Sequence, residues 1–213
     1  MKVSIIAAST LCGRIGPGFK GGPEDRAFLE EMRERTQASL IGAGTFRLGD
    51  CEMRGRGGCI IDGRIRAIVS GSGNIPLTNR KIFSEGPRPI VFTLAENAVK
   101  LGNRVKGAAR VIGCGGKKGK MDLAEVFGAL KDLGVESVLV EGGSTLNYEV
   151  LKAGLCREIF CTVSPKLLGV RGAPSLVDGP LPLGDPFIHL VLKDVRYSKT
   201  SGDVFLHYEV FLG

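Results

Sequence analysis

The chain has 213 residues, a formal net charge of +7 and a hydrophobic share of 43%, so it is long enough for one sizeable domain or two small ones. No apolar run approaches the length of about 20 residues that a membrane span needs, which excludes a membrane-spanning helix, and we expect no membrane partner. The positive charge favours anionic partners. However, the one dense basic run, residues 117–120, and a 6% aromatic share without Trp argue against nucleic acid.

The N-terminus and the cysteines indicate the compartment. The first nine residues contain only a short apolar stretch, which is typical of a first strand and not of a signal peptide, so we expect a cytoplasmic protein. Six cysteines contain no C-x-x-C pair, and the two histidines, His189 and His207, lie far along the chain from most of them. This pattern argues against a zinc site and predicts free thiols and no bound metal.

In chain order, the first half alternates between strand and helix patterns. Apolar runs predict strands at residues 3–8, 38–41, 65–70, 89–94 and 110–113. A glycine-rich loop at residues 9–22 precedes a helix that Pro23, Glu24 and Asp25 open with acidic residues in its first turn. A short helix follows residue 94, and residues 122–133 form the clearest helix, with Asp122 as its N-cap and Gly134 as its stop.

Two glycine-rich segments resemble nucleotide-binding motifs but differ from them in detail. Residues 42–47, Gly-Ala-Gly-Thr-Phe-Arg, match only the first half of a dinucleotide fingerprint, although Gly44 and Thr45 can offer an N–H group and a hydroxyl to a phosphate. Residues 113–121 resemble a P-loop. They fail in detail because Cys114 and Met121 replace the required Gly and Ser or Thr, which excludes a Walker-type ATPase.

The most informative stretch is residues 138–148, an apolar strand followed by Glu141, two glycines and a helix. Ser144 is a plausible helix cap, and three apolar residues, Leu146, Val150 and Leu151, fall on one side of that helix. A strand, a glycine turn and a helix start together suit a phosphate. Glu141 ends the strand, where ligands bind in open α/β sheets.

The last third predicts an antiparallel end to the sheet. Residues 158–163 form a strand, residues 174–186 a loop, and residues 189–197 and 204–212 two alternating strands around a turn. We therefore predict an α/β fold with one mixed, mostly parallel sheet, helices on both faces and a C-terminal antiparallel hairpin. The whole chain, residues 1–213, is predicted to be a single domain.

Taken together, these segments resemble the reductase domain of riboflavin biosynthesis, which has a dihydrofolate-reductase-like fold. The resemblance covers nearly the whole chain. It rests on these ordered matches: residues 10–14 (Thr-Leu-Cys-Gly-Arg), Arg33, Gly44-Thr45, residues 53–56, Glu141-Gly142-Gly143 with Leu146, and Gly154-Leu155 leading to residues 165–169 (Pro-Lys-Leu-Leu-Gly).

The resemblance implies an NADPH-dependent oxidoreductase that acts as a homodimer. Its substrate would be 5-amino-6-ribosylaminouracil 5′-phosphate, reduced by hydride at the sugar carbon in its opened imine form to a ribityl chain. It implies that the cofactor is held by Ser9, Thr45, Asp50, Gly71, Gly143, Ser144, Thr145 and Leu146. It assigns the substrate to Arg33, Met53, Arg56 and Glu141, with Glu141 also as the catalytic residue.

The chain departs from the family pattern in several places, including the loop at residues 16–22, which lacks the family's usual substrate-side pattern. Cys12 stands where the family commonly has Asp, and Gly49-Asp50-Cys51 replaces its Asp-Asp-Pro. The zinc deaminase signature that often precedes this reductase, H-x-E with P-C-x-x-C, is absent. These differences imply a stand-alone reductase or one with a different substrate.

Two other functions stay open from the sequence. A pterin or folate reductase on the same fold needs a buried carboxylate from the first helix, where Asp25 and Glu30 lie. A basic nucleotide- or RNA-binding module needs no catalysis. The choice between NADPH and NADH, the hydride face, the quaternary arrangement and the role of Cys12 also stay open. The reductase interpretation requires that the turns at Gly44-Thr45 and Gly142-Gly143 open at the same edge of the sheet.

Overall fold

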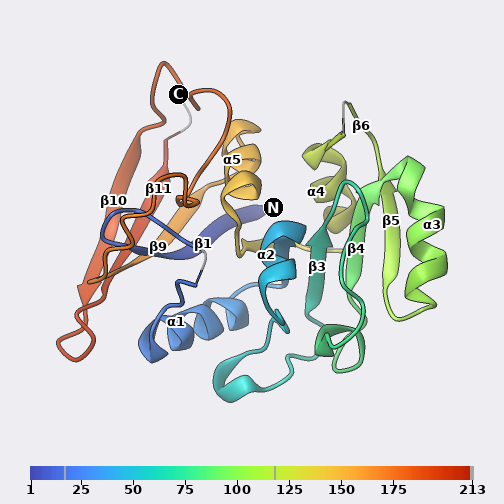
Figure 1. The fold of residues 1–213 in the computed structure, drawn as a ribbon, viewed down its shortest axis with the longest axis horizontal. Helices are drawn as coiled ribbons and strands as arrows, with labels where there is room; N and C mark the ends of the chain where they lie inside the picture. The colour runs from blue at the N-terminus through green and yellow to red at the C-terminus, as the bar shows by residue number, and fades with distance from the viewer. Residues whose placement is uncertain (17, 118, 212–213) are drawn as a thin grey trace.

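The computed structural model describes residues 1–16, 18–117 and 119–211, and it contains a nine-stranded sheet in the order β10-β11-β9-β1-β8-β2-β3-β4-β5 (Figure 1). The strands are β1 (Lys2–Thr10), β2 (Ala38–Gly42), β3 (Ile65–Val69), β4 (Ile90–Leu94), β5 (Arg110–Cys114), β8 (Ser137–Val140), β9 (Glu158–Ser164), β10 (Leu190–Tyr197) and β11 (Val204–Val210). The seven from β9 to β5 run parallel, and β11 and β10 are antiparallel. The predicted mixed sheet with a C-terminal hairpin is confirmed.

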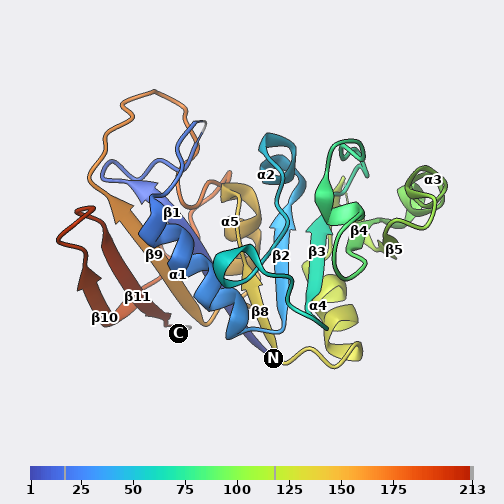
Figure 2. The ribbon, with the colours of Figure 1, turned by 90° about the horizontal axis from the view of Figure 1, so that it is seen from below.

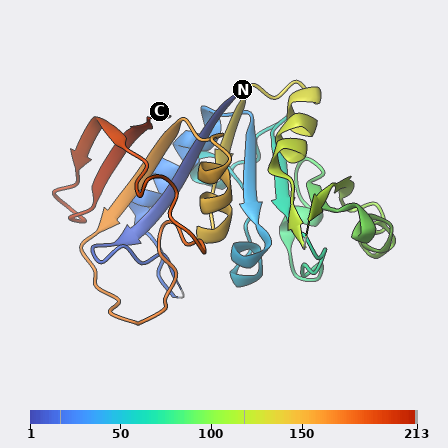
Figure 3. The ribbon, with the colours of Figure 1, turned by 90° about the horizontal axis from the view of Figure 1, so that it is seen from above.

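Helices cover both faces of the sheet because its central strands are apolar on both sides. One face packs against α4 (Leu123–Asp132) and α5 (Ser144–Lys152), which lie in front of the sheet in Figure 3. The other packs against α1 (Pro23–Glu34), α2 (Ala43–Leu48) and α3 (Ala95–Val105), with α1 in front in Figure 2. The two faces bury separate apolar clusters, so the sheet is the middle layer of three.

Several predicted boundaries shift, each for a local reason. β1 continues through Thr10, because its pairing with β9 extends to the end of that strand, so Ser9 lies in a strand and not in a loop. The chain turns at Gly42 straight into α2, which places Gly44 and Thr45 in a helix. Gly143, not Ser144, is the N-cap of α5, and no side chain caps that helix.

Other predicted features are met closely. Asp122 caps α4 by accepting a hydrogen bond from the Ala124 N–H at 2.8 Å, and Gly134 follows it with a φ of +81°. Residues 116–121 include the two short paired strands β6 (Gly116–Lys117) and β7 (Lys120–Met121), not a P-loop followed by a helix. The predicted last strand, residues 204–212, ends at Val210, and Leu212 lies outside the described residues. Two short 3₁₀ turns, Arg56–Gly58 and Lys81–Phe83, complete the elements.

The topology places a site between β8 and β2. The strand that follows β2 in the chain, β3, lies on one side of this pair. The strand that follows β8, β9, lies on the other side, beyond β1. Connections that leave neighbouring parallel strands in opposite directions open a crevice at their carboxyl ends. Within the described residues, no helix is long and apolar enough to cross a membrane.

Candidate active site

A pocket of about 900 Å³ lies at this edge of the sheet, at the upper end of the range for ligand sites. Its lining comes from the carboxyl halves of β1, β2 and β3, the turn that follows β8, one face of α1, most of α2, the first turn of α5, and β7. Seven of the predicted cofactor residues line it: Thr45, Asp50, Gly71, Gly143, Ser144, Thr145 and Leu146.

The two glycine turns touch each other across the pocket. The Gly42 N–H donates to the Gly142 carbonyl at 2.9 Å, and a Cβ on Gly143 would lie 2.7 Å from Thr45 Oγ1. The peptide bond between Gly142 and Gly143 is cis. The turns therefore open at one edge of the sheet, as the reductase interpretation requires, and a side chain at residue 143 would fill the space between them.

Beside these turns lies a buried ion pair between Arg33 and Glu141. Arg33 Nη2 lies 2.6 Å from Glu141 Oε2, Nε donates to Oε1 at 2.9 Å, and the two side chains are only 4% and 5% exposed. Ser39 Oγ donates to the same Oε1 at 2.5 Å, and Arg64 Nη2 donates to Ser39 Oγ at 2.7 Å. Arg33 and Glu141 both line the pocket, so the structure brings these two predicted substrate residues together.

This network fixes the charge of Glu141. Burial alone would raise the pKa of its carboxyl group, but the charge and hydrogen bonds of Arg33, with those of Ser39 and the charge of Arg64, outweigh burial and lower the pKa below its usual value. Burial in turn lowers the pKa of Arg64 to about 10. Glu141 is therefore an ionised hydrogen-bond acceptor and not an acid.

Three predicted site residues do not line the pocket. Ser9 is buried, with its Oγ 3.8 Å from Cys161 Sγ. Met53 is 2% exposed and packs in the core under α2 and α3, where its φ is +56°. Arg56 is exposed and lies 3.5 Å and 3.4 Å from the carboxylates of Glu31 and Glu34 on α1.

The pocket also holds two residues of α1 that the motif matches did not assign to it, Asp25 and Leu29. With Arg33 they occupy successive turns of α1 and line the pocket together, because residues four apart share one face of a helix. That spacing was visible in the sequence, but which face of α1 meets the sheet was not. Phe19, the one aromatic residue in the lining, precedes them on the loop.

Asp25 differs from Glu30, the other acidic residue considered on this helix. Burial raises the pKa of the Asp25 carboxyl group, the Thr162 hydroxyl opposes that shift, and the charge of Asp203 adds to it. Glu30 is outside the lining, where it accepts hydrogen bonds from Arg26 and the Gly57 N–H. The pocket thus has an ionised carboxylate at Glu141 and a more easily protonated one at Asp25.

The cysteines form neither disulfides nor a metal site. All six are free, and within the described residues no group of three His, Cys, Asp or Glu side chains could hold a metal. The exposed Cys12 has its pKa lowered to about 7 by the backbone N–H of Gly169, with help from Thr10 and Leu168. It lies outside the pocket lining, whereas Cys51 lines it, and burial raises the pKa of Cys51 to about 11.

Comparison with known proteins gives one consistent picture. The family model of the RibD C-terminal domain matches residues 12–206. The 2,5-diamino-6-ribosylamino-4(3H)-pyrimidinone 5′-phosphate reductase of Methanothermobacter thermautotrophicus is 29% identical over 98% of this chain and 97% of its own length.

Two solved structures share the fold. A pyrimidine reductase-like protein of Corynebacterium diphtheriae superposes with a TM-score of 0.79 at 19% identity, over 100% of this chain and 92% of its own. The deaminase/5-amino-6-(5-phosphoribosylamino)uracil reductase of Thermotoga maritima gives 0.76 at 23% identity, over 99% of this chain and 56% of its own. With a family model matched over nearly its whole length, the chain belongs to the RibD C-terminal domain family, the reductases of riboflavin biosynthesis.

Proposed function

We propose that this protein is a nicotinamide-dependent oxidoreductase that reduces the ribosylamino group of a pyrimidine ribotide to a ribitylamino group. The observation that carries the proposal is the meeting of the Gly42–Thr45 and Gly142–Leu146 turns in one pocket beside the Arg33–Glu141 pair. One half of that pocket suits a dinucleotide and the other a sugar phosphate with a base. The whole chain acts as one domain in this proposal.

The relatives suggest which ring the substrate carries. The sequence resemblance implied the uracil ribotide, but the Methanothermobacter relative, which this chain matches from end to end, is named for the 2,5-diaminopyrimidinone ribotide. The two rings differ at position 2, where the first has an oxo group and the second an amino group. We propose the diaminopyrimidinone ribotide as the substrate.

The residues present fit a dinucleotide. The first-turn N–H groups of α5, at Ser144, Thr145 and Leu146, have no partner within the helix, and with the positive end of its dipole they suit a pyrophosphate. Residue 143 leaves the space between the two turns open only because it is a glycine. When bound, a reduced nicotinamide supplies the hydride for the sugar carbon.

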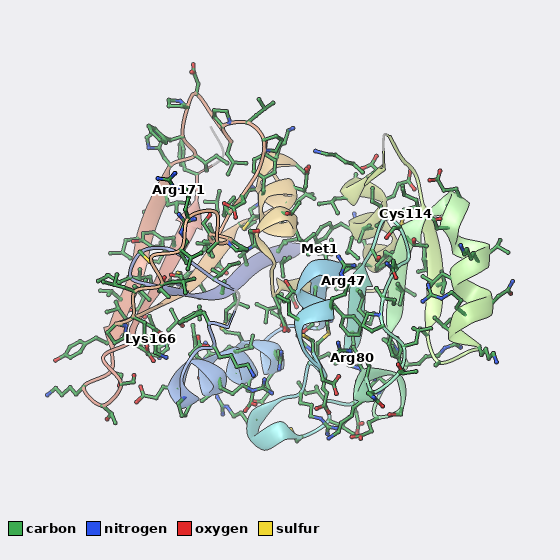
Figure 4. The ribbon with its side chains drawn as sticks, viewed as in Figure 1. Met1, Arg47, Arg80, Cys114, Lys166 and Arg171 are labelled. Carbon is green, nitrogen blue, oxygen red and sulfur yellow. The ribbon has the colours of Figure 1, made fainter. Side chains whose placement is uncertain are left out.

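Arginines at the far side of α2 favour NADPH over NADH. Arg47 lines both the main pocket and a neighbouring one of about 590 Å³, which Arg80 and Arg104 also line. Arg80 Nη2 donates to the Arg47 carbonyl at 3.2 Å, and Figure 4 shows the two side chains on neighbouring parts of the molecule. None of the three forms an ion pair within the part of the chain that the structure describes, so their charge is available to a 2′-phosphate.

Glu141 orients the substrate in this proposal. Its Oε1 accepts from Arg33 and Ser39, whereas among the described residues Oε2 accepts only from Arg33, which leaves a lone pair for a ribose hydroxyl or a ring amino group. Because Glu141 stays ionised, the proton that the opened sugar oxygen takes up comes from another donor. The contribution of Glu141 is position and charge, which is how enzymes with few acid–base groups gain rate.

A second copy of the chain completes the proposal. Leu190, Leu192, Val195 and Tyr197 share one face of β10 and are 41–67% exposed. The chain has 11143 Å² of accessible surface, roughly 1,600 Å² more than the about 9,500 Å² of a compact monomer of its mass. One side of a standard interface takes about 800 Å², so the excess is large enough for an interface, and the exposed apolar face of β10 is the surface that we propose for it. Val195→Lys on this face should give a monomer in sedimentation velocity, and a variant that stays dimeric would contradict it.

The cytoplasmic location is also part of the proposal. It is supported by the free state of all six cysteines, which is typical of a reducing compartment.

The decisive experiment measures the loss of NADPH absorbance with the diaminopyrimidinone ribotide, the uracil ribotide and dihydrofolate in parallel. We expect turnover with a ribotide and none with dihydrofolate. Folded protein that binds no NADP(H) at millimolar concentration would contradict the proposal.

One observation favours a second candidate, a pterin or folate reductase. Such an enzyme needs a buried carboxylate from the first helix, and Asp25 lines the pocket with a raised pKa. Turnover of dihydrofolate without turnover of either ribotide would select this candidate in the same assay.

A further inference from the structure

Asp25 differs from the other carboxylates of the pocket because it forms no ion pair with a described residue. The other carboxylates in the pocket are engaged: Glu141 with Arg33, Glu149 with Lys120 Nζ at 3.1 Å, Glu52 with Arg54, and Asp50 with the Lys81 N–H at 3.2 Å. Asp25 forms no ion pair with any described residue. Its one side-chain hydrogen-bond partner among the described residues is the Thr162 hydroxyl, so a carboxylate that no cation pairs with faces the pocket and keeps acceptor capacity for hydrogen-bond donors of the ligand.

The surroundings of Asp25 suit a flat heterocycle. Phe19, Ile15 and Leu29 line the same pocket, and stacking on an aromatic ring is the usual way in which proteins hold an unpaired base. Asp25 lies two helical turns from Arg33, about 12 Å along the axis of α1. This separation is enough to place a pyrimidine ring between Asp25 and a ribose held at the Arg33–Glu141 pair.

The glycine before α1 lets the carboxylate reach this position. A Cβ on Gly21 would lie 1.8 Å from Asp25 Oδ2, so a larger residue there would displace the carboxylate. Gly21 has no positive φ, and its conformation is open to any residue. A larger residue is excluded at position 21 because its Cβ would take the space that the Asp25 carboxylate occupies.

The two candidate rings present different edges to a carboxylate. In the diaminopyrimidinone, N3–H and the 2-amino group form a pair of parallel donors, like the edge of a guanidinium. In the uracil, N3–H stands beside an oxo group, which is an acceptor. A carboxylate matches the first edge with two hydrogen bonds, whereas the second sets an oxygen against an oxygen.

We propose that Asp25 is the specificity-determining residue of this enzyme, accepting hydrogen bonds from N3–H and the 2-amino group and thereby selecting the ring that has not been deaminated. This inference rests on the proposed function and adds the chemical basis of its substrate choice. The C2–N3 edge lies across the ring from the ribosylamino group, so Asp25 can bind it while the sugar carbon remains near Glu141. The selection needs no contact with the reacting atoms.

The test compares kcat/KM for the two ribotides in the full-length protein, its Asp25→Asn variant and a Glu24→Gln control. An Asn side chain offers one acceptor and one donor, which match N3–H and the 2-oxo group of uracil. Glu24 is the neighbouring acid, lies outside the pocket lining and accepts from Ser198 Oγ at 2.8 Å. Gly21→Ala is a second variant, which moves the carboxylate without removing it.

Wild type is expected to prefer the diaminopyrimidinone ribotide by about 100-fold or more, since a site built for a donor rejects an analogue that lacks it. Asp25→Asn should lower that ratio by at least about 30-fold or reverse it, and Gly21→Ala should lower it. Glu24→Gln should leave it unchanged, and NADPH affinity should stay within about twofold in all variants. A ratio within about threefold of wild type in Asp25→Asn would overturn the inference.

Calorimetric titration with the two ribitylamino products provides a readout that does not need turnover. The same order of preference is expected in the product affinities, with the same loss or reversal of that preference in Asp25→Asn. If wild type reduces neither ribotide, the proposed function fails, while the titration still decides the ring preference. If it reduces both equally and binds both products equally, only the role of Asp25 fails.

Discussion

The two halves of the pocket are built from different materials. The half that we propose for the cofactor is mainly backbone: the Gly42–Thr45 and Gly142–Leu146 turns approach within hydrogen-bond distance and leave the first N–H groups of α5 open. The half that we propose for the substrate is made of side chains, with the Arg33–Glu141 pair at one end and Asp25 of α1 at the other. The comparison leads us to expect that the backbone half is sensitive to added side-chain volume, whereas the side-chain half is sensitive to the loss of a charge.

The largest expected effect tests the charge half. Arg33→Met leaves Glu141 buried without its partner, which costs about 3–5 kcal/mol of folding free energy, measured by urea unfolding at pH 7. The matched control is Arg26→Met, which removes a partly exposed pair with Glu30 on the same helix and should cost less than about 1 kcal/mol. Equal losses in the two variants would show that the Arg33–Glu141 pair has no special weight.

The pH dependence of that loss has a definite sign. Because the folded-state pKa of Glu141 is lowered, its contribution to stability is present above the pKa of an unfolded Glu and is lost as the pH falls through the folded-state value. The difference in stability between wild type and Arg33→Met should therefore shrink on acidification. A difference independent of pH would mean that Glu141 is not ionised in the fold.

The next effect tests the backbone half. A Cβ on Gly143 would lie 2.7 Å from Thr45 Oγ1, so Gly143→Ala must push the two turns apart and should weaken NADPH binding at least about tenfold, roughly 1.4 kcal/mol. Fluorescence titration of NADPH measures it. Gly128→Ala is the control, since a Cβ there meets nothing within 4 Å on α4, and it should leave the affinity unchanged.

The same difference between backbone and side-chain contacts determines which parts of the pocket could be predicted from the sequence. The strand, glycine turn and helix start around Glu141 and around Thr45 are local signals, since neighbouring residues produce them. For that reason the sheet, most helices and the position of seven proposed cofactor residues around one pocket could be predicted. Asp25 faces the pocket only because of how α1 packs on β1 and β9, which no local pattern states.

The same limit explains the assignments that the pocket does not support. Met53 and Arg56 were placed in the site by their position in a motif, and that segment instead packs Met53 into the core and pairs Arg56 with the outer side of α1. Ser9 was placed in a loop, but strand pairing carries it past the pocket edge. A motif predicts a segment, whereas its side-chain directions depend on contacts that are distant in sequence.

A smaller effect sharpens the comparison within the cofactor half, where Arg47 is a charged side chain among backbone contacts. Arg47→Ala should raise the KM for NADPH by about tenfold and leave that for NADH nearly unchanged, because it removes one charge-assisted contact to a 2′-phosphate. Steady-state assays with both cofactors measure it. An equal rise for both cofactors would mean that Arg47 shapes the pocket without selecting the cofactor.

The smallest expected effect is a change in stability at Asp25. Its carboxyl group faces Arg26 on its own helix, Cys161 and Thr162 on β9, and Asp203 in the turn between β10 and β11. Burial raises its pKa in the fold, so its ionisation costs stability once the pH rises through the folded-state value. Asp25→Asn should therefore be slightly more stable than wild type at pH 7 and lack the acidic limb in kcat/KM for the diaminopyrimidinone ribotide. Thermal unfolding and a pH–rate profile measure these two quantities. A variant that is less stable and has an unchanged pH–rate profile would show that Asp25 supports the fold and not the choice of ring. A variant that gains stability and loses its preference between the two ribotides shows the trade-off expected of a binding residue.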